Sequence, residues 1–283
     1  MFKTFEMELA GRPLIIETGK MAKQANGAVL VRYGDTAVLV ATTASKEPRE
    51  GTDFFPLTVD YEEKMYAVGK MPGGFLRREG RPGNSAILCA RLIDRPIRPL
   101  FDKRCRNDIH VVATVLSVDY DNAPELCGMI GASASIGISD IPWDGPIAGV
   151  RVGRVDGKYV INPTQEEMAA STMNVTVAGS EEAIMMVEGG AQEAPEEEVL
   201  DAIMFGHETI KEICRFQKKI IEEVGKEKRV LTFPEVPAEI EKDVEAFATE
   251  SLKKAIFDAD KLRRDGNIAA AKKAAMEHFA DIY

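Results

Sequence analysis

Hydrophobic and polar positions alternate along the first part of the chain with the two-residue period of β-strands. Two β-branched runs, residues 28–33 and 36–43, flank Gly34-Asp35, a pair typical of a two-residue hairpin turn. Apolar residues stand at every second position of 55–61, and residues 109–120 form a long β-branched run. The pattern therefore predicts a sheet.

Two segments within this β-rich part favour helices instead. The run "AILCARLID", which Asn84 or Ser85 can cap, predicts a helix. It should end near Pro96, because proline lacks an N–H group and restricts the residue before it. The small residues of 127–139 predict a helix packed closely against a sheet.

The next part predicts more strands. Residues 149–164 have the pattern of a hairpin that turns at Asp156-Gly157, and residues 173–178 and 183–188 have that of two further strands.

From Glu193 the apolar residues recur at intervals of three and four, which predicts a long helix that ends at Gly225. Two prolines and a change of composition then predict a linker. Beyond it the pattern is helical, with Gly266 between two candidate helices. We therefore divide the chain into a core (residues 1–225), a linker (226–238) and a partial all-helical domain (239–283).

The composition is that of a globular protein, with 45% hydrophobic and 29% charged residues among 283. No apolar run reaches the roughly 18 residues of a membrane-spanning helix, and the start lacks the features of a signal peptide. We therefore expect a cytoplasmic protein without a membrane partner. The four cysteines and three histidines are scattered, which favours buried thiols over a disulfide framework or a metal site.

The charge is distributed unevenly. The chain carries a net charge of −10, but residues 64–106 hold eleven Lys or Arg and three acidic residues, a local balance of +8. Such a concentration of positive charge implies an anionic partner, phosphate or nucleic acid. The alternative is that these arginines pair with acidic residues elsewhere in the fold.

The segment "MPGGFLRREGRPG", residues 71–83, concentrates this charge in a turn, and "ARLIDRPIR" extends it along one face of the predicted helix. Guanidinium groups match phosphate oxygens, and an aromatic ring can stack on an unpaired base, which suits a single strand. In the alternative interpretation, Phe75 and Leu76 anchor the turn and Asp94 pairs with an arginine. The candidate binding residues are Phe75, Arg77, Arg78, Arg81, Arg91, Arg95 and Arg98.

No catalytic constellation is complete. Asp60, Glu62 and Glu63 could hold a divalent metal, although a solvated strand end explains them equally well. The acidic residues of 193–201 are typical of a helix start. The small-residue segment with Ser133 and Ser135 resembles a phosphate-binding loop only weakly, because the glycine-rich pattern with its lysine is absent. We predict no catalytic residue and no metal ligand in this chain.

The stretch "FFPLTVDYEEKMYAVGKMPGGFLRREGRPGNSAILCARLIDRPIRPLF" resembles the first core domain of bacterial polynucleotide phosphorylases. The segments "MIGASAS", "NPTQEE", "VAGSEEAIMMVE" and "FGHE" continue the resemblance in order, and the tail resembles the start of that family's all-helical domain. The resemblance implies an α/β (α+β) fold: an RNase PH-like core, similar to ribosomal protein S5 domain 2, followed by a small all-α domain.

The resemblance also implies an activity, the phosphorolysis of RNA from its 3′ end, with inorganic phosphate as co-substrate and nucleoside diphosphates as products. It implies Mg²⁺ in a second core, a homotrimeric ring with a channel for single-stranded RNA, and an association with RNA-degradation machinery. In that arrangement the turn at 71–83 lines the channel, where Arg77 and Arg78 grip the RNA.

In this family the phosphate-binding serines and metal-binding aspartates belong to the second core. Residues 121–125 ("DNAPE") stand where that core has its serine-rich loop, and Thr172 and Asn174 stand near its aspartates. The resemblance therefore implies an RNA-guiding core whose chemistry is done elsewhere. Two alternatives stay open: a non-catalytic RNA-binding or assembly module, and a self-sufficient single-core enzyme of the RNase PH type.

Overall fold

The computed structural model of the chain describes residues 2–49, 51–231, 233, 237–280 and 282–283. The chain forms two compact units, residues 1–231 and 232–283. Each unit is considered by itself below. Residues 232 and 234–236 of the predicted linker lie outside the described part of the chain.

The first unit opens with a six-stranded sheet, made of β1 (Lys3–Leu9), β2 (Arg12–Thr18), β3 (Gly27–Tyr33), β4 (Thr36–Pro48), β5 (Leu57–Glu63) and β6 (Asn107–Ser117). Its strand order is β1-β2-β3-β4-β6-β5. All neighbours pair antiparallel except β5, which runs parallel to β6 at one edge. The predicted hairpin at Gly34-Asp35 and the later strands are confirmed. The first hairpin, β1–β2, was missed, although Phe5, Met7 and Leu9 of β1 alternate with polar residues as in a strand.

The second sheet has four antiparallel strands, β7 (Ala148–Val155), β8 (Lys158–Ile161), β9 (Met173–Gly179) and β10 (Ile184–Ala191), in the order β10-β9-β7-β8. The predicted turn at Asp156-Gly157 is confirmed. Both of its residues have positive φ, 49° and 77°, as this two-residue turn requires. A short helix, α3 (Gln165–Ala170), was missed, although Thr164 and Glu167 form a capping box at its start.

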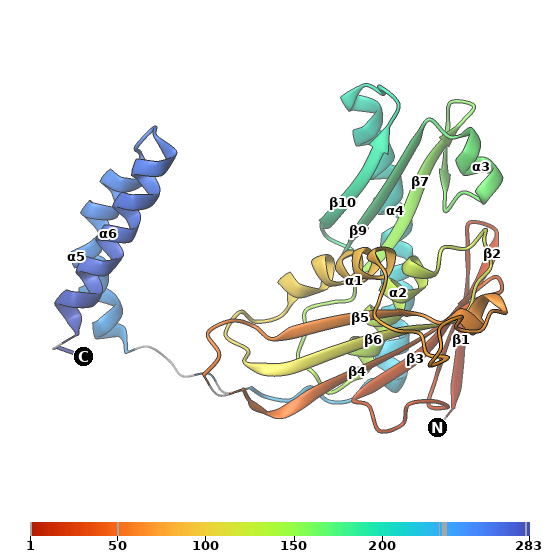
Figure 1. Ribbon diagram of the computed structural model, residues 1–283, viewed down its shortest axis with the longest axis horizontal. Coiled ribbons are helices and arrows are strands. Elements are labelled where there is room, and N and C mark those ends of the chain that lie inside the picture. The colour runs from red at the N-terminus through yellow and green to blue at the C-terminus, as the bar shows by residue number, and fades with distance from the viewer. Residues whose placement is uncertain (1, 50, 232, 234–236, 281) are drawn as a thin grey trace. The chain divides into compact units, whose positions relative to one another are not determined.

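Helix α2 (Pro124–Ile138) lies at the junction of the two sheets (Figure 1). It packs on β3 and β4 of the first sheet and on β7 of the second, and all its residues from Leu126 onward are buried. Small residues permit this close approach: a Cβ on Gly131 would lie 2.5 Å from Cγ2 of Val40. The predicted helix at 127–139 is confirmed. On its other side lies the long helix α4 (Glu196–Val224), which covers the second sheet.

Helix α1 (Asn84–Ile97) differs from the prediction at its start, while its end lies near Pro96 as predicted. Its N-cap is Gly83, and neither Asn84 nor Ser85 caps it. At the other end, Pro96 lies inside the helix, which continues to Ile97 and then into the 3₁₀ turn η2 (Arg98–Leu100). Proline removes only its own N–H donor, and burial of Pro96 and Ile97 holds the last turn in place.

Three of the four cysteines are buried, as predicted. Cys105, Cys127 and Cys214 are buried and Cys89 is partly buried, all as free thiols. Burial raises the pKa of Cys127 to about 12. These thiols therefore act as small apolar residues.

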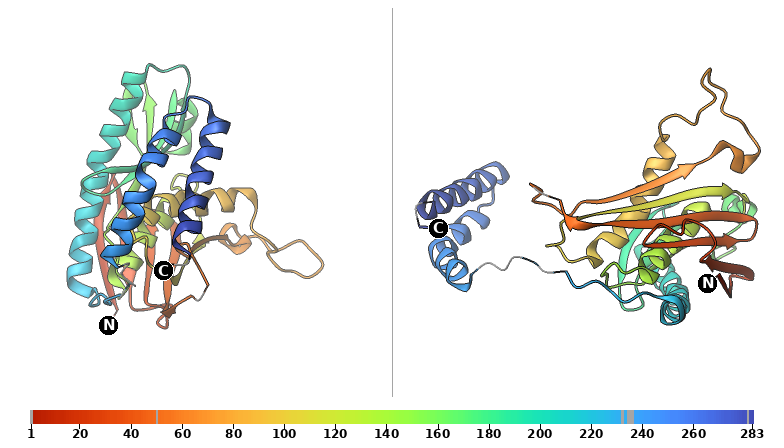
Figure 2. Two further views of the ribbon diagram at one scale, coloured as in Figure 1. Left: turned by 90° about the vertical axis from the view of Figure 1, so that its left-hand side faces the viewer. Right: turned by 90° about the horizontal axis from the view of Figure 1, so that it is seen from below.

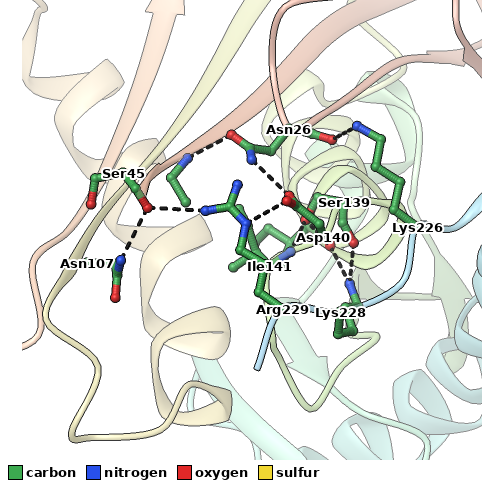
Figure 3. Close-up of polar contacts among 11 residues, drawn as sticks. Asn26, Ser45, Asn107, Ser139, Asp140, Ile141, Lys226, Lys228 and Arg229 are labelled. Carbon is green, nitrogen blue, oxygen red and sulfur yellow. Dashed lines mark hydrogen bonds and ion pairs between the residues drawn. The ribbon is translucent and has the colours of Figure 1, made fainter. Parts of the chain in front are cut away.

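After α4 the chain crosses back over the first unit in a polar segment that we name the strap, residues 226–229 (Figure 3). The Lys228 ammonium donates hydrogen bonds to three carbonyl oxygens at the C-terminal end of α2, at 2.7–3.0 Å. A cation is favourable at this end of a helix dipole. Burial nevertheless lowers the pKa of Lys228 to about 8.

Arg229 ties the end of the strap to the first sheet (Figure 3). Its Nε donates to Asp140 at 2.5 Å and its Nη1 donates to the carbonyl oxygen of Ser45 at 3.2 Å. Asn26 donates to the other oxygen of Asp140 at 2.8 Å. Burial alone would raise the pKa of Asp140, but the hydrogen bonds from Arg229 and Asn26 outweigh it and hold this pKa below its ordinary value.

The second unit contains two helices, α5 (Ala238–Ile256) and α6 (Lys261–Phe279), packed against each other. The predicted break at Gly266 is wrong, because Gly266 lies within α6. The break occurs where Asp260 caps α6 by accepting a hydrogen bond from the N–H of Arg263. Across the described part of the chain, no helix combines the length and apolar character needed to cross a membrane.

Candidate nucleic-acid interface

The segment between β5 and α1 contains residues 71–83, which we name the arginine turn. In both views of Figure 2 the orange-to-tan chain after β5 extends away from the two sheets of the first unit. Only one short 3₁₀ helix, η1 (Met65–Val68), interrupts this segment. The side chain of Phe75 is fully exposed and that of Leu76 is 74% exposed. The alternative in which these two residues anchor the turn is therefore wrong.

The three cations of the turn are exposed and unengaged. Among the described residues, no acidic side chain or carbonyl oxygen accepts a hydrogen bond from the guanidinium group of Arg77, Arg78 or Arg81. At Arg77 the backbone has φ of 52°, a left-handed conformation that a long side chain seldom adopts. Fully hydrated guanidinium groups keep all their donors for an anionic partner.

Of the three arginines of α1, Arg91 and Arg95 remain accessible to solvent. Arg91 is exposed, and Arg95 forms a solvent-exposed ion pair with Glu188 of β10 at 2.9 Å. Such an exposed pair is weak and leaves the arginine accessible. Both side chains therefore stay available to an anion beside α1.

Arg98, in contrast, is held by hydrogen bonds within the fold. Its guanidinium group donates two hydrogen bonds to Asp94, at 2.7 and 2.9 Å, and a third to the carbonyl oxygen of Leu57 at 3.0 Å. The predicted pairing of Asp94 with an arginine is confirmed. Arg98 thereby joins the end of α1 to β5, and the structure does not bring it together with the arginines of the turn.

The carboxylates at the end of β5 do not converge on a common point. Asp60 contacts His110 at 2.7 Å, and Glu62 contacts Lys64 at 2.8 Å. The hydrogen bond from Lys64 lowers the pKa of Glu62. Among the residues that the structure describes, no three His, Cys, Asp or Glu side chains form a group that could hold a metal ion. The described residues therefore do not fit a Mg²⁺ site.

The two serines of α2 have structural roles. Ser133 accepts a hydrogen bond from the N–H of Ile147 at 2.9 Å, and Ser135 shares one with Thr42 at 2.6 Å. Both are completely buried. Their weak resemblance to a phosphate-binding loop is therefore misleading, because no ligand can reach their hydroxyl groups.

The segment 121–125 is also occupied by internal contacts. Asn122 donates to Asp119 at 2.5 Å, and Glu125 forms an ion pair with Arg151 at 2.5 Å. A serine-rich loop is absent at this position of the sequence, and the polar groups that stand there stabilise the fold.

Two family models match most of the first unit. Residues 10–142 match domain 1 of the 3′ exoribonuclease family (RNase PH), and residues 145–209 match domain 2. The chain belongs to the 3′ exoribonuclease family. The boundary between the two matches falls just before β7, where the second sheet begins.

Curated relatives of this 3′ exoribonuclease family chain are named polyribonucleotide nucleotidyltransferase. That of Heliobacterium modesticaldum is 58% identical over 97% of this chain and 39% of its own length, and that of Syntrophomonas wolfei is 57% identical over 99% and 40%. That of Geobacillus kaustophilus is 54% identical over 98% and 38%. The chain thus spans about two-fifths of the length of these relatives. The predicted resemblance to polynucleotide phosphorylases is confirmed.

Among solved structures, the crystal structure of rice (Oryza sativa) Rrp46 is similar to this chain with a TM-score of 0.58 at 15% sequence identity. The similarity covers 78% of this chain and 94% of that one. At this identity the likeness concerns the fold alone, and it confirms the predicted RNase PH-like α/β architecture.

Proposed function

We propose that this chain is the RNA-guiding core of a phosphorolytic 3′-to-5′ exoribonuclease of the polyribonucleotide nucleotidyltransferase type. In that reaction an oxygen of inorganic phosphate bonds to the terminal phosphorus of RNA, while the bond from that phosphorus to the preceding 3′ oxygen breaks. A nucleoside diphosphate leaves, and the shortened RNA regains its 3′ hydroxyl group. The family membership and the names of the relatives support this reaction for the whole protein.

The observation that carries the guiding role is the arginine turn, whose guanidinium groups have no partner in the described fold. Arg77, Arg78 and Arg81 would each bind phosphate oxygens of single-stranded RNA, and the exposed ring of Phe75 would stack on a base. Arg91 and Arg95 would extend the path along α1. The guanidinium group of Arg98 already donates hydrogen bonds within the fold, so Arg98 would contribute only its charge. Phosphate contacts carry no base information, so this grip would be tolerant of sequence.

The remaining parts of the proposal follow from the family. The whole protein would form a homotrimer around an RNA channel, take phosphate as co-substrate and Mg²⁺ at a site outside these 283 residues, and act in the cytoplasm with RNA-degradation machinery. Because the described residues offer no metal-binding group, no step of the reaction is assigned to this chain. Its residues bind and orient RNA.

The test is phosphate-dependent release of nucleoside diphosphate from a short oligo(A), with this chain alone and Mg²⁺ present. We expect RNA binding without release, since the sequence predicts no catalytic residue in this chain. Release that tracks the protein and disappears without phosphate would instead favour the self-sufficient enzyme. A folded sample that neither binds nor cleaves the oligomer would favour an assembly module.

A further inference from the structure

The arginine turn contains one acidic residue, Glu79, which stands between Arg78 and Arg81 in the sequence. A carboxylate so close to arginines could pair with them and neutralise part of the charge that the turn presents. Among the described residues, Glu79 forms no ion pair with an arginine of the turn. Its Oε1 accepts a hydrogen bond from the backbone N–H of Met65 instead, at 3.0 Å.

This hydrogen bond closes the turn at its base. Met65 is the first residue of η1, just after β5, and Glu79 lies on the returning part of the chain before α1. The N-cap residue of η1, Lys64, provides no side-chain cap, so the carboxylate of Glu79 satisfies an N–H group that this helix leaves without a partner. We name the contact between Met65 and Glu79 the clasp.

The clasp lies where the backbone of the turn is most constrained. Arg77 has φ of 52° and Gly80 has φ of 78°, and Glu79 stands between them. A left-handed arginine persists only where neighbouring contacts hold the chain. One such contact is local, from the N–H of Arg77 to the carbonyl oxygen of Gly74 at 3.0 Å. Among the described residues, no hydrogen bond joins residues 71–78 to either sheet, so the clasp is the contact that holds the two sides of the turn together.

Order in the turn affects binding because a segment that is unconstrained in the free protein loses conformational freedom when a ligand holds it. A segment that the free protein already keeps in place loses less, and its ligand binds more tightly for the same contacts. The clasp restricts the backbone that carries Arg77 and Arg78. It also keeps the one carboxylate of the turn occupied.

We propose that Glu79 is a positioning residue for RNA binding, a role that rests on the guiding function proposed above. Through the clasp it holds the arginines of the turn in place, and the same hydrogen bond keeps its carboxylate from pairing with them. Glu79 does not contact the RNA, because a carboxylate repels phosphate groups. It acts through Arg77, Arg78 and Arg81.

Three substitutions of Glu79 separate the clasp from the charge. Glu79→Gln removes the charge but keeps an oxygen that can accept the N–H of Met65, whereas Glu79→Ala removes both. Oligo(A) should therefore bind about fivefold more weakly to Glu79→Ala than to Glu79→Gln, the equivalent of one hydrogen bond. Glu79→Asp keeps the charge on a side chain too short for the clasp. Its carboxylate is free to pair with the arginines, so it should bind oligo(A) most weakly of the three.

Amide hydrogen exchange measures the clasp without RNA. The N–H of Met65 should exchange about fivefold faster in Glu79→Ala than in Glu79→Gln, because only the second variant retains an acceptor for it. The control is Glu250→Ala, which removes an exposed acidic residue of α5. It should leave both the exchange of Met65 and the affinity for oligo(A) close to wild type.

The outcomes separate the positioning role from the guiding function. Equal oligo(A) affinities of Glu79→Gln and Glu79→Ala would overturn the positioning role, whether or not the exchange of Met65 differs between them. If Arg77→Ala with Arg78→Ala binds oligo(A) as wild type does, the guiding function is wrong and the positioning role is wrong with it. If that double variant binds weakly while the Gln and Ala variants agree, only the positioning role is wrong.

Discussion

Two short cationic segments of this chain, the arginine turn and the strap, contain similar charge but use it in opposite ways. In the strap, the side chains of Lys226, Lys228 and Arg229 all donate hydrogen bonds to carbonyl or carboxylate oxygens of the first unit. In the turn, the side chains of Arg77 and Arg78 contact no such group among the described residues. A cation that the fold satisfies stabilises the fold, whereas a cation that the fold leaves hydrated is available to a ligand.

The largest expected effect is on RNA binding, which should depend on the arginines of the turn. Replacing both arginines, Arg77→Ala with Arg78→Ala, should weaken oligo(A) binding about 10–100-fold at low salt, because each lost phosphate contact also removes a released counterion. The plot of log K against log salt should flatten by about 1.4, since each contact to a single strand contributes roughly 0.7. Fluorescence anisotropy over a salt series measures both quantities.

The matched control for this double variant is Lys272→Ala with Lys273→Ala, two adjacent exposed cations of α6. It should leave both the affinity and the salt dependence close to wild type. Equal losses in the two double variants would mean that net charge, and not the turn, determines binding.

The next effect concerns stability. Arg229→Ala should lower the free energy of unfolding by about 2 kcal/mol, because it removes a hydrogen bond between charged groups and leaves Asp140 partly buried with one partner fewer. Urea titration measures the change. Arg215→Ala, which removes an exposed arginine paired with Glu181, should lower the free energy of unfolding much less, because solvent screens an exposed ion pair. RNA affinity should stay unchanged in both variants, which would sharpen the contrast with the turn.

The smallest effect is a pH dependence. The pKa of Asp140 in the folded chain is below its ordinary value, so the folded state holds this proton less tightly than the unfolded chain. Its stabilising contribution is complete above the unfolded pKa of about 3.9 and is lost as the pH falls through the folded pKa. Asp140→Asn should therefore reduce the loss of stability that wild type shows as the pH falls below the unfolded pKa of Asp. If this variant lost stability at low pH as wild type does, other carboxylates would cause that loss.

The sequence predicted most of the fold because period-two alternation and two-residue turns are local signals. It placed β3, β4 and β6 and the turn at Asp156-Gly157 correctly. It failed at helix ends that a cap determines: Gly83, and neither Asn84 nor Ser85, precedes α1, and the break between the two last helices lies at Asp260 and not at Gly266. Such boundaries depend on which residue makes the cap, which the apolar pattern does not determine.

The site was predicted less completely. Glycine and proline around the arginines indicated an exposed turn, and the structure agrees. Nothing local indicated that Arg98 would bind Asp94 and the carbonyl oxygen of Leu57, or that Glu79 would accept the N–H of Met65. Both facts arise from segments that are separate in sequence and that the fold brings together.

The parallel pairing of β5 with β6 has a consequence for how far the turn can reach. A parallel neighbour requires the chain to cross from one end of the sheet to the other, and the arginine turn belongs to this obligatory crossover. The entropy of closing such a loop grows only logarithmically, by about 0.6 kcal/mol for each doubling of its length. The sheet therefore fixes where the turn leaves and re-enters the fold, while the distance to which it projects can vary at little thermodynamic cost.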